Sequence, residues 1–284
     1  MYTVKQAAQL TGIPEATLRI WERRYGIVEP HRSPSGYRLY DDAQLARLRS
    51  MAAQVRAGVP ASHAATAILA AEAWPVAAVA SDTDDLVAAA ASLDSVGLQQ
   101  LVGRAFGRAE FEQVADEWIV PQIGALGDAW AEGRLTVAQE HFASGALMRA
   151  IGSVFDAAAN RATGSAVLVG LPAGERHELA LYAFATCLRR RGINVVYLGA
   201  DIPTAEWEQA AAERGARAAV IGVSSRRAVG VAQSVVDLLT ELRPPVSAWV
   251  GGSRRGKVTG AQCLPDGVAE AAAILQLNLT TGRA

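Results

Sequence analysis

Hydrophobic and polar positions divide the chain into three parts with different periodicities. After residue 165, short apolar runs alternate with helix-like stretches. The runs are 166–169, 195–198, 219–223 and 246–250, and the helix-like stretches are 178–191, 203–214, 228–241 and 267–276. This alternation is typical of βαβ units in a doubly wound parallel sheet. Residues 86–160 show helical periodicity with almost no strand pattern, which predicts a helical bundle.

Near the N-terminus, the stretch YTVKQAAQLTGIPEATLRIWERRYG predicts a helix, a turn and a second helix. Gly12 follows the first helix, and Pro14 suits the first turn of the second. Leu18, Trp21 and Tyr25 recur at i, i+3 and i+7, so these three side chains are expected to face a core. This pattern indicates a helix-turn-helix.

The next stretch, EPHRSPSGYRLYDDAQLARL, predicts a tight basic hairpin followed by a helix. Pro30, Pro34 and Gly36 shape the hairpin, and either Asp41 or Asp42 caps the helix. A helix-turn-helix followed directly by such a hairpin predicts a winged helix. Residues 70–85, which carry a proline and an acidic cluster, are expected to form a linker.

The positive charge of the chain is local. The formal net charge of all 284 residues is −1, which excludes a whole-chain attraction to nucleic acid or membrane. The first 57 residues carry nine basic and five acidic side chains, a net charge of +4. Arginine on an exposed helix can contact both phosphates and base edges. The candidate DNA contacts are Arg19, Arg23, Arg24, Arg32, Tyr37 and Arg38.

Two alternatives stay open for these residues. Arg23 or Arg24 could instead form an ion pair with Glu22 or Asp41, and the basic helix could simply be the solvated face of a small bundle.

The remaining composition favours a cytoplasmic protein, associated with the nucleoid when bound to DNA. Cys187 and Cys263 lie far apart without CxxC spacing, which argues against a disulfide framework or a cysteine zinc site. The N-terminal stretch MYTVKQAAQL has no apolar core behind basic residues, so no signal peptide is expected. No apolar run reaches the ~18 residues of a transmembrane helix.

The middle part brings three functional side-chain types to one helix start. Thr136 and Gln139 predict a capping box, and the helix that follows places Val137, Glu140 and His141 on one face. An indole, Trp130, lies shortly before it. The alternative is purely structural: a first-turn glutamate complements the helix dipole, and the indole and imidazole belong to the core.

Three predicted strands of the C-terminal part end in residues suited to a ligand. His177 follows the first strand, Ser224-Ser225 the third, and Gly251-Gly252 the fourth. Ligands of open α/β sheets bind beyond the carboxyl ends of the strands. The first loop lacks GxGxxG spacing and so presents an imidazole, a good transition-metal ligand, rather than a phosphate cradle.

Glu175 is placed to orient the second nitrogen of this imidazole. A surface histidine beside a helix start is the alternative interpretation of this loop.

The N-terminal 70 residues resemble the MerR family of transcription regulators. The residues that carry the resemblance are Thr3-Val4, Gly12, Thr17-Leu18-Arg19, Trp21-Glu22, Tyr25-Gly26 and Ser35-Gly36-Tyr37-Arg38-Leu39-Tyr40. The resemblance implies a dimer on near-palindromic promoter DNA, with the second helix in the major groove and the wing on phosphate.

The three strand ends resemble cobalamin-binding domains with the pattern Asp-x-His-x-x-Gly, Ser-x-Leu and Gly-Gly. Glu175 stands in the Asp position and Ala180 in the final Gly position, where its methyl group is expected to crowd the entry of the nucleotide tail. The resemblance implies that His177 is the lower axial ligand of cobalt. It also implies that Gly251, Gly252 and one of the two serines line the slot for the nucleotide tail.

The order of the three parts resembles CarH/LitR-type photoreceptor repressors. We expect a winged helix-turn-helix domain at 1–72, a four-helix-bundle cap at 82–160 and a flavodoxin-like, Rossmann-type cobalamin domain at 165–284. The resemblance implies that adenosylcobalamin promotes a DNA-binding tetramer, which light takes apart. The residues implied to cover the adenosyl group are Trp130, Val137, Glu140 and His141.

One departure from this family concerns the light state. Its best-known members have a histidine after the cap tryptophan, whereas this chain has Ala131.

The function predicted from the sequence is therefore a light-responsive transcription regulator, expected to be a repressor and not an enzyme. Its alternatives are a regulator that senses cobalamin or another tetrapyrrole without light, and one whose cobalamin domain no longer binds. A corrinoid carrier module of an enzyme is disfavoured because a winged helix would have no role there.

Overall fold

The structure is a computed structural model that describes residues 1–32, 36–56, 60–72, 82–158 and 164–281. The chain forms two compact units. The first comprises Met1–Asp82 with Gln99–Arg108, and the second comprises Thr83–Leu98 with Ala109–Ala284.

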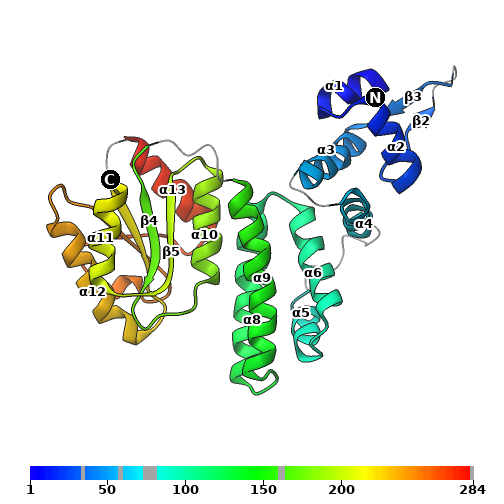
Figure 1. Cartoon of the computed structure of the whole chain (residues 1–284). Helices are drawn as coiled ribbons and strands as arrows, with labels where there is room; N and C mark the ends of the chain where they lie inside the picture. The colour runs from blue at the N-terminus through cyan, green and yellow to red at the C-terminus, as the bar shows by residue number, and fades with distance from the viewer. Residues whose placement is uncertain (33–35, 57–59, 73–81, 159–163, 282–284) are drawn as a thin grey trace. The chain divides into compact units, whose positions relative to one another are not determined.

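The N-terminal unit contains the predicted winged helix-turn-helix (Figure 1). Its elements are β1 (Tyr2–Thr3), α1 (Val4–Thr11), α2 (Glu15–Tyr25), β2 (His31–Arg32), β3 (Arg38–Tyr40), α3 (Asp42–Arg56) and α4 (Ala61–Glu72). The three strands pair antiparallel in the order β1-β3-β2, so the wing has a third strand, β1, that the periodicity did not predict. Leu18 and Trp21 are buried in the core, as expected, and Tyr25 is half-buried.

Local signals account for the ends of these helices. Gly12 is left-handed, with φ of +69°, and its N–H donates to Ala8 O at the end of α1. Pro14 occupies the cap position of α2 rather than its first turn. Asp41 rather than Asp42 caps α3, because Asp41 Oδ1 accepts from Gln44 N at 2.8 Å.

The helical segment begins at α5 (Asp82–Ala91) and continues with α6 (Ser95–Arg108). A continuous run follows through α7 (Phe111–Val114), the π-helical turn η1 (Ala115–Ile119) and α8 (Val120–Ala131), and the segment ends with α9 (Val137–Ala157). Both ends of the predicted linker at 70–85 are helical, because α4 continues to Glu72 and α5 begins at Asp82; residues 73–81 lie outside the described residues. Thr136 and Gln139 form the predicted capping box at the start of α9.

The C-terminal part is a parallel sheet covered on both faces by helices. The strands are β4 (Val167–Pro172), β5 (Val195–Ile202), β6 (Ala218–Gly222), β7 (Ser247–Gly251) and the unpredicted β8 (Gln262–Cys263). The helices are α10 (Leu179–Arg190), α11 (Thr204–Arg214), α12 (Arg226–Glu241) and α13 (Val268–Thr281). The order β5-β4-β6-β7-β8 is that of flavodoxin-like folds.

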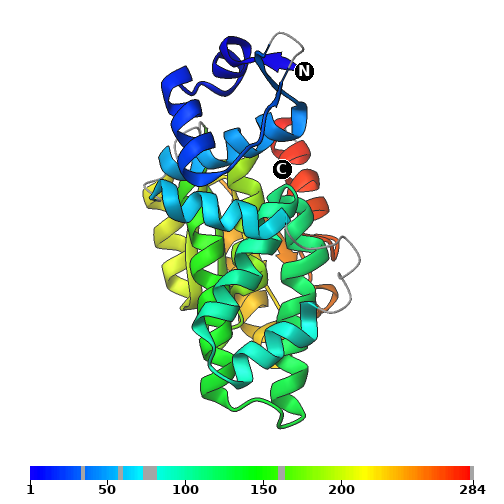
Figure 2. The ribbon, with the colours of Figure 1, turned by 90° about the vertical axis from the view of Figure 1, so that its right-hand side faces the viewer.

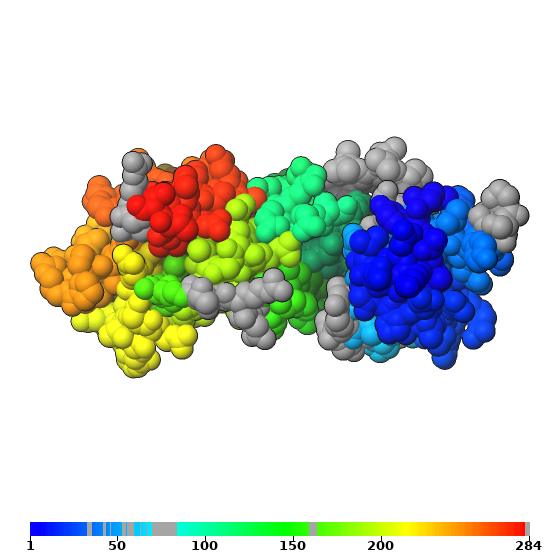
Figure 3. Space-filling model, turned by 90° about the horizontal axis from the view of Figure 1, so that it is seen from above, coloured from blue at the N-terminus to red at the C-terminus, as the bar shows by residue number. Residues whose placement is uncertain are grey.

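This topology determines where the ligand loops meet. β4 pairs with β5 on one side and with β6 on the other. The loops that follow β4 and β6 therefore run to opposite faces of the sheet, and a crevice opens between them at the carboxyl ends of these two strands. Val167, Leu168 and Val169 are all buried, since α11 and α12 cover one face of the sheet and α10 and α13 the other. Figure 3 shows α10 and α13 side by side on the surface.

The part of the helical segment from Ala109 onward packs on α10 and α13 through polar contacts. Arg190 of α10 reaches Glu110 at 2.8 Å and Glu112 at 3.0 Å, and Asp116 of η1 accepts from Ala269 N at 3.2 Å, at the start of α13. Burial raises the pKa of Glu112, but the Arg190 guanidinium outweighs this and holds it below its usual value. These contacts fix the helices that follow Ala109 to the sheet domain.

Candidate functional site

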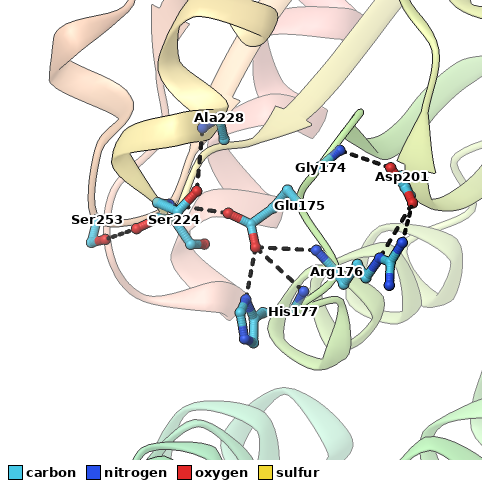
Figure 4. A network of polar contacts seen from close by, with 9 residues as sticks. Gly174, Glu175, Arg176, His177, Asp201, Ser224, Ala228 and Ser253 are labelled. Atoms are coloured by element: carbon cyan, nitrogen blue, oxygen red, sulfur yellow. Dashed lines mark hydrogen bonds and ion pairs between the residues drawn. The ribbon is translucent and has the colours of Figure 1, made fainter.

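The loop after β4 is organised around a buried carboxylate (Figure 4). Only 1% of Glu175 is exposed, and a charge so deeply buried requires partners. Glu175 Oε2 accepts from Ser225 N at 3.0 Å, and Oε1 accepts from Arg176 N at 3.2 Å. Glu175 Oε1 also lies 2.8 Å from His177 Nδ1. One carboxylate therefore joins the loop after β4 to the loop after β6.

This geometry prepares His177 to be a ligand. Next to a carboxylate, Nδ1 carries the proton and donates it, which leaves the lone pair on Nε2. The His177 side chain is 86% exposed, so Nε2 faces solvent at the mouth of the site. The sequence-based expectation that Glu175 orients this imidazole agrees with the contact.

The charge state of Glu175 supports this tautomer. Burial by itself raises the pKa of the Glu175 carboxyl, but hydrogen bonds from His177 and Ser225 outweigh burial and hold its pKa below the usual value. Glu175 is therefore ionised near neutral pH and acts only as an acceptor.

Asp201 at the end of β5 is a site residue that sequence reasoning missed. Its carboxylate accepts from Gly174 N at 2.7 Å and from Arg176 Nη2 at 2.9 Å. Its own N–H donates to Glu175 O at 3.0 Å. The backbone of Asp201 is left-handed, with φ of +60°, a conformation that Asp tolerates better than most residues. Its position at the carboxyl end of a strand was the available signal.

The carboxylate of Asp201 should stabilise the fold in a pH-dependent way. The Gly174 N–H and then Arg176 lower its pKa below the ordinary value of 3.8. A lowered folded-state pKa gives stability that is present above the unfolded pKa and is lost as pH falls through the folded one. Asp201→Asn, which tolerates the same backbone, should thus lower the urea midpoint at pH 7, with the gap to wild type closing towards pH 3.

Asp237→Asn on α12 is the matched control, because the Asp237 carboxylate accepts only from the neutral amide of Gln233. A gap between wild type and Asp201→Asn that is equally wide at pH 7 and pH 3 would show that the charge of Asp201 does not stabilise the loop.

The two serines after β6 have different roles. Ser225 Oγ caps α12 by accepting from Ala228 N at 3.2 Å, and Ser225 N binds Glu175. Ser224 lines the cavity at the strand ends, and its carbonyl accepts from Ser253 Oγ at 3.0 Å. The structure thus gives the cavity position to Ser224.

A mostly apolar cavity of about 200 Å³ opens beside His177. Ser224, Gly251 and Gly252 line it, and so does Ala180, so the methyl group of Ala180 does not close it. Its apolar lining is Val120, Leu171, Leu181, Phe184, Val220, Leu264, Val268 and Ala271.

Gly252 has no room for a side chain. Its φ is +94°, and a Cβ there would lie 2.6 Å from Val223 O. At Gly251 the nearest atom to an added Cβ is Leu264 Cδ1, at 3.9 Å. Gly252 is therefore required by the turn itself, whereas Gly251 leaves space on the cavity side.

The four predicted cap residues lie at the turn between α8 and α9 and do not line this cavity. His141 Nδ1 is 2.5 Å from Glu140 Oε2, and both Trp130 and Val137 are more than half exposed. Figure 1 shows this turn extending beyond the same end of the sheet as the loop after β4, and Figure 2 shows the green hairpin of α8 and α9 from another side.

The length of α9 measures this extension. Gly152 of α9 lies against Tyr182, in the first turn of α10. Glu140 precedes Gly152 by twelve residues, or about 18 Å along the helix axis. The cap residues therefore stand beyond the strand ends.

The predicted DNA contacts gather around one concavity in the N-terminal unit. A cavity of about 810 Å³ between α2 and the wing is lined by Arg19, Arg23, Arg32 and Arg38. Arg24 and Tyr37 do not line it: Arg24 lies 5.6 Å from the Tyr25 ring centre, and Tyr37 is 71% exposed on the wing.

The ion pairs of this surface differ from the alternative left open for Arg23 and Arg24. Glu22 pairs with Arg38, whose Nε lies 3.0 Å from Glu22 Oε2, rather than with Arg23 or Arg24. Asp41 lies 3.6 Å from His31. Arg38 therefore bridges the wing to α2, while Arg19, Arg23 and Arg32 line the same concavity.

The described residues also bear on metal and membrane binding. They contain no group of three or more His, Cys, Asp or Glu residues arranged to hold a metal ion. In the same residues no helix is both long and apolar enough to cross a bilayer.

Comparison with known proteins assigns all three parts. Residues 2–70 match the MerR HTH family regulatory proteins, and residues 83–154 and 165–269 each match a B12 binding domain. The HTH-type transcriptional repressor CarH of Myxococcus xanthus is 30% identical over 89% of both chains. The chain belongs to the CarH family of MerR-type regulators.

Other relatives agree with this assignment. The repressor CarA of Myxococcus xanthus is 28% identical over 88% of this chain and 85% of its own. The monomethylamine corrinoid protein of Methanosarcina barkeri superposes with a TM-score of 0.55 at 19% identity, over 68% of this chain and 96% of that one, which supports the fold alone. This member of the CarH family is thus a transcription regulator with a cobalamin-binding domain, and the predicted fold class is confirmed.

Proposed function

We propose that this regulator binds adenosylcobalamin with His177 Nε2 as the lower ligand of cobalt and releases promoter DNA in response to light. The observation that carries the proposal is the exposed imidazole, held in one tautomer by the buried Glu175 at the mouth of an apolar cavity. Bound adenosylcobalamin supplies a light-sensitive bond between cobalt and carbon. The protein supplies binding, orientation and exclusion of water.

The residues present fit this cofactor. Gly251 and Gly252 present bare backbone to the cavity, and Ser224 adds a hydroxyl, so a nucleotide tail can enter beside the sheet. Beyond the strand ends, Trp130 and Val137 offer exposed apolar surface, and the Glu140–His141 pair offers hydrogen bonds. We infer that these four residues cover the upper face of the ring.

The DNA-binding form is proposed to be an oligomer on a near-palindromic operator, at least a dimer and, by resemblance to the family, a tetramer. The basic concavity of α2 and the wing supplies the contacts to DNA. We propose a repressor without enzymatic activity that acts in the cytoplasm, at the nucleoid when bound.

The lack of a histidine after Trp130 favours a second candidate function, cobalamin sensing without light. Position 131 is alanine, and His141 is the one histidine of the sequence between residues 82 and 160. A light state in this protein therefore forms without an imidazole at position 131.

An absorption and size experiment separates these functions. We expect protein mixed with adenosylcobalamin in darkness to retain it after desalting, and green light to change both its spectrum and its elution volume. Protein loaded with hydroxocobalamin, which has no bond from cobalt to an alkyl carbon, is the control and should elute alike in dark and light. Retention without a change in size would favour cobalamin sensing, and no retention would contradict both functions.

A further inference from the structure

The outward face of α2 combines arginines with an apolar centre. At 100° per residue, Leu18 and Trp21 point into the core, so the opposite face is exposed. The exposed residues of that face are Ala16, Arg19, Ile20, Arg23 and Arg24. On the helical wheel, Arg19 and Arg24 form the two edges, while Ala16, Ile20 and Arg23 lie between them.

Ile20 is exposed where a purely phosphate-binding helix would be polar. Its exposed fraction is 44%, so almost half of this apolar side chain faces solvent. One exposed apolar side chain is ordinary on a protein surface. Ile20, however, is surrounded by three arginines on the second helix of a helix-turn-helix, beside the basic concavity. A partner that covers this face therefore needs negative charge opposite the arginines and an apolar group opposite Ile20.

The major groove of DNA has this combination. Phosphates line its edges, and thymine alone places an apolar group, the C5-methyl, on its floor. The isoleucine side chain can neither donate nor accept a hydrogen bond. It therefore cannot read the polar edges of bases, but it can pack on a methyl group.

We propose that Ile20 reads thymine in the operator by packing against its C5-methyl group, while Arg19, Arg23 and Arg24 reach phosphates and neighbouring bases. Ala16, one turn earlier on the same face, lets the helix approach the groove closely. This inference rests on the DNA-binding function and adds to it the base that this chain selects.

The test uses thymine and uracil, which differ only in the C5-methyl. Duplexes bound by the full-length protein are first selected from a random pool, and each enriched thymine is then replaced by deoxyuridine. We expect wild type to lose about fourfold in affinity at one thymine per half-site, which corresponds to about 0.8 kcal/mol. Ile20→Ala should bind both duplexes equally, and Ile20→Val should retain part of the difference.

Leu10→Ala is the matched control, since Leu10 is an apolar side chain of α1 that is 48% exposed. This variant should distinguish thymine from uracil as wild type does, and thermal melting should confirm that both alanine variants fold.

Equal binding of thymine and uracil duplexes by wild type would overturn the proposal, and so would full discrimination by Ile20→Ala. A failure of DNA binding itself would be seen earlier, because wild type would enrich no duplex from the pool.

Discussion

The His177→Ala protein is expected to leave a desalting column without cobalamin, under conditions in which wild type retains it. His177 Nε2 is the ring nitrogen that stays available at this site, because Nδ1 is held by Glu175. In the proposed complex, removing the imidazole would remove the bond between His177 and cobalt. The absorption spectrum of the desalted protein measures the loss.

The control for this variant is folding of the cofactor-free protein. The His177 side chain is 86% exposed, and Glu175 keeps its bonds from Ser225 N and Arg176 N. The melting temperature without cofactor should therefore stay close to that of wild type, and His31→Ala in the wing should retain cofactor normally. Undiminished retention by His177→Ala, with an unchanged spectrum, would remove His177 from the site.

Gly252→Ala is expected to destabilise the sheet domain by about 3 kcal/mol, or roughly 6–12 °C in melting temperature. An added Cβ would meet Val223 O at 2.6 Å, and the φ of +94° is strained for any residue with a side chain. The carbonyl cannot move freely, because Val223 O already accepts from Arg254 N at 2.9 Å. Val223 N also donates to Gly251 O at 2.8 Å.

Gly251→Ala separates stability from binding. Its Cβ would have no neighbour closer than 3.9 Å, so the fold should tolerate it within about 1 kcal/mol. The same methyl group would enter the cavity and should weaken cobalamin retention. Differential scanning calorimetry of both variants without cofactor makes the comparison; equal melting temperatures would show that the turn at Gly252 is not constrained as described.

The alternation of apolar runs was enough to predict the sheet domain. A strand covered on both faces must be apolar at successive positions, so β4, β5, β6 and β7 were each visible as short runs of such residues. The capping box of Thr136 and Gln139 was equally visible, because both its hydrogen bonds join residues three apart. β1 and β8 were missed, since each has only two residues and exists through pairing with a distant strand.

The sequence also placed His177, Ser224-Ser225 and Gly251-Gly252 at strand ends, and the order of strands along a parallel sheet then brought them together. Which serine faces the cavity could not be predicted, since both follow the same strand. Two contacts in the folded protein give Ser225 a structural role. Its Oγ caps α12, and its N–H donates to the carboxylate of Glu175.

Asp201 and the partner of Glu22 were likewise decided by tertiary structure. Asp201 lies 27 residues from Gly174, and Arg38 lies 16 residues from Glu22. Short-range periodicity carries the information for helices, strands and caps, because their hydrogen bonds join near neighbours. Pairing between loops and between the wing and α2 depends on contacts that exist only after the elements have packed.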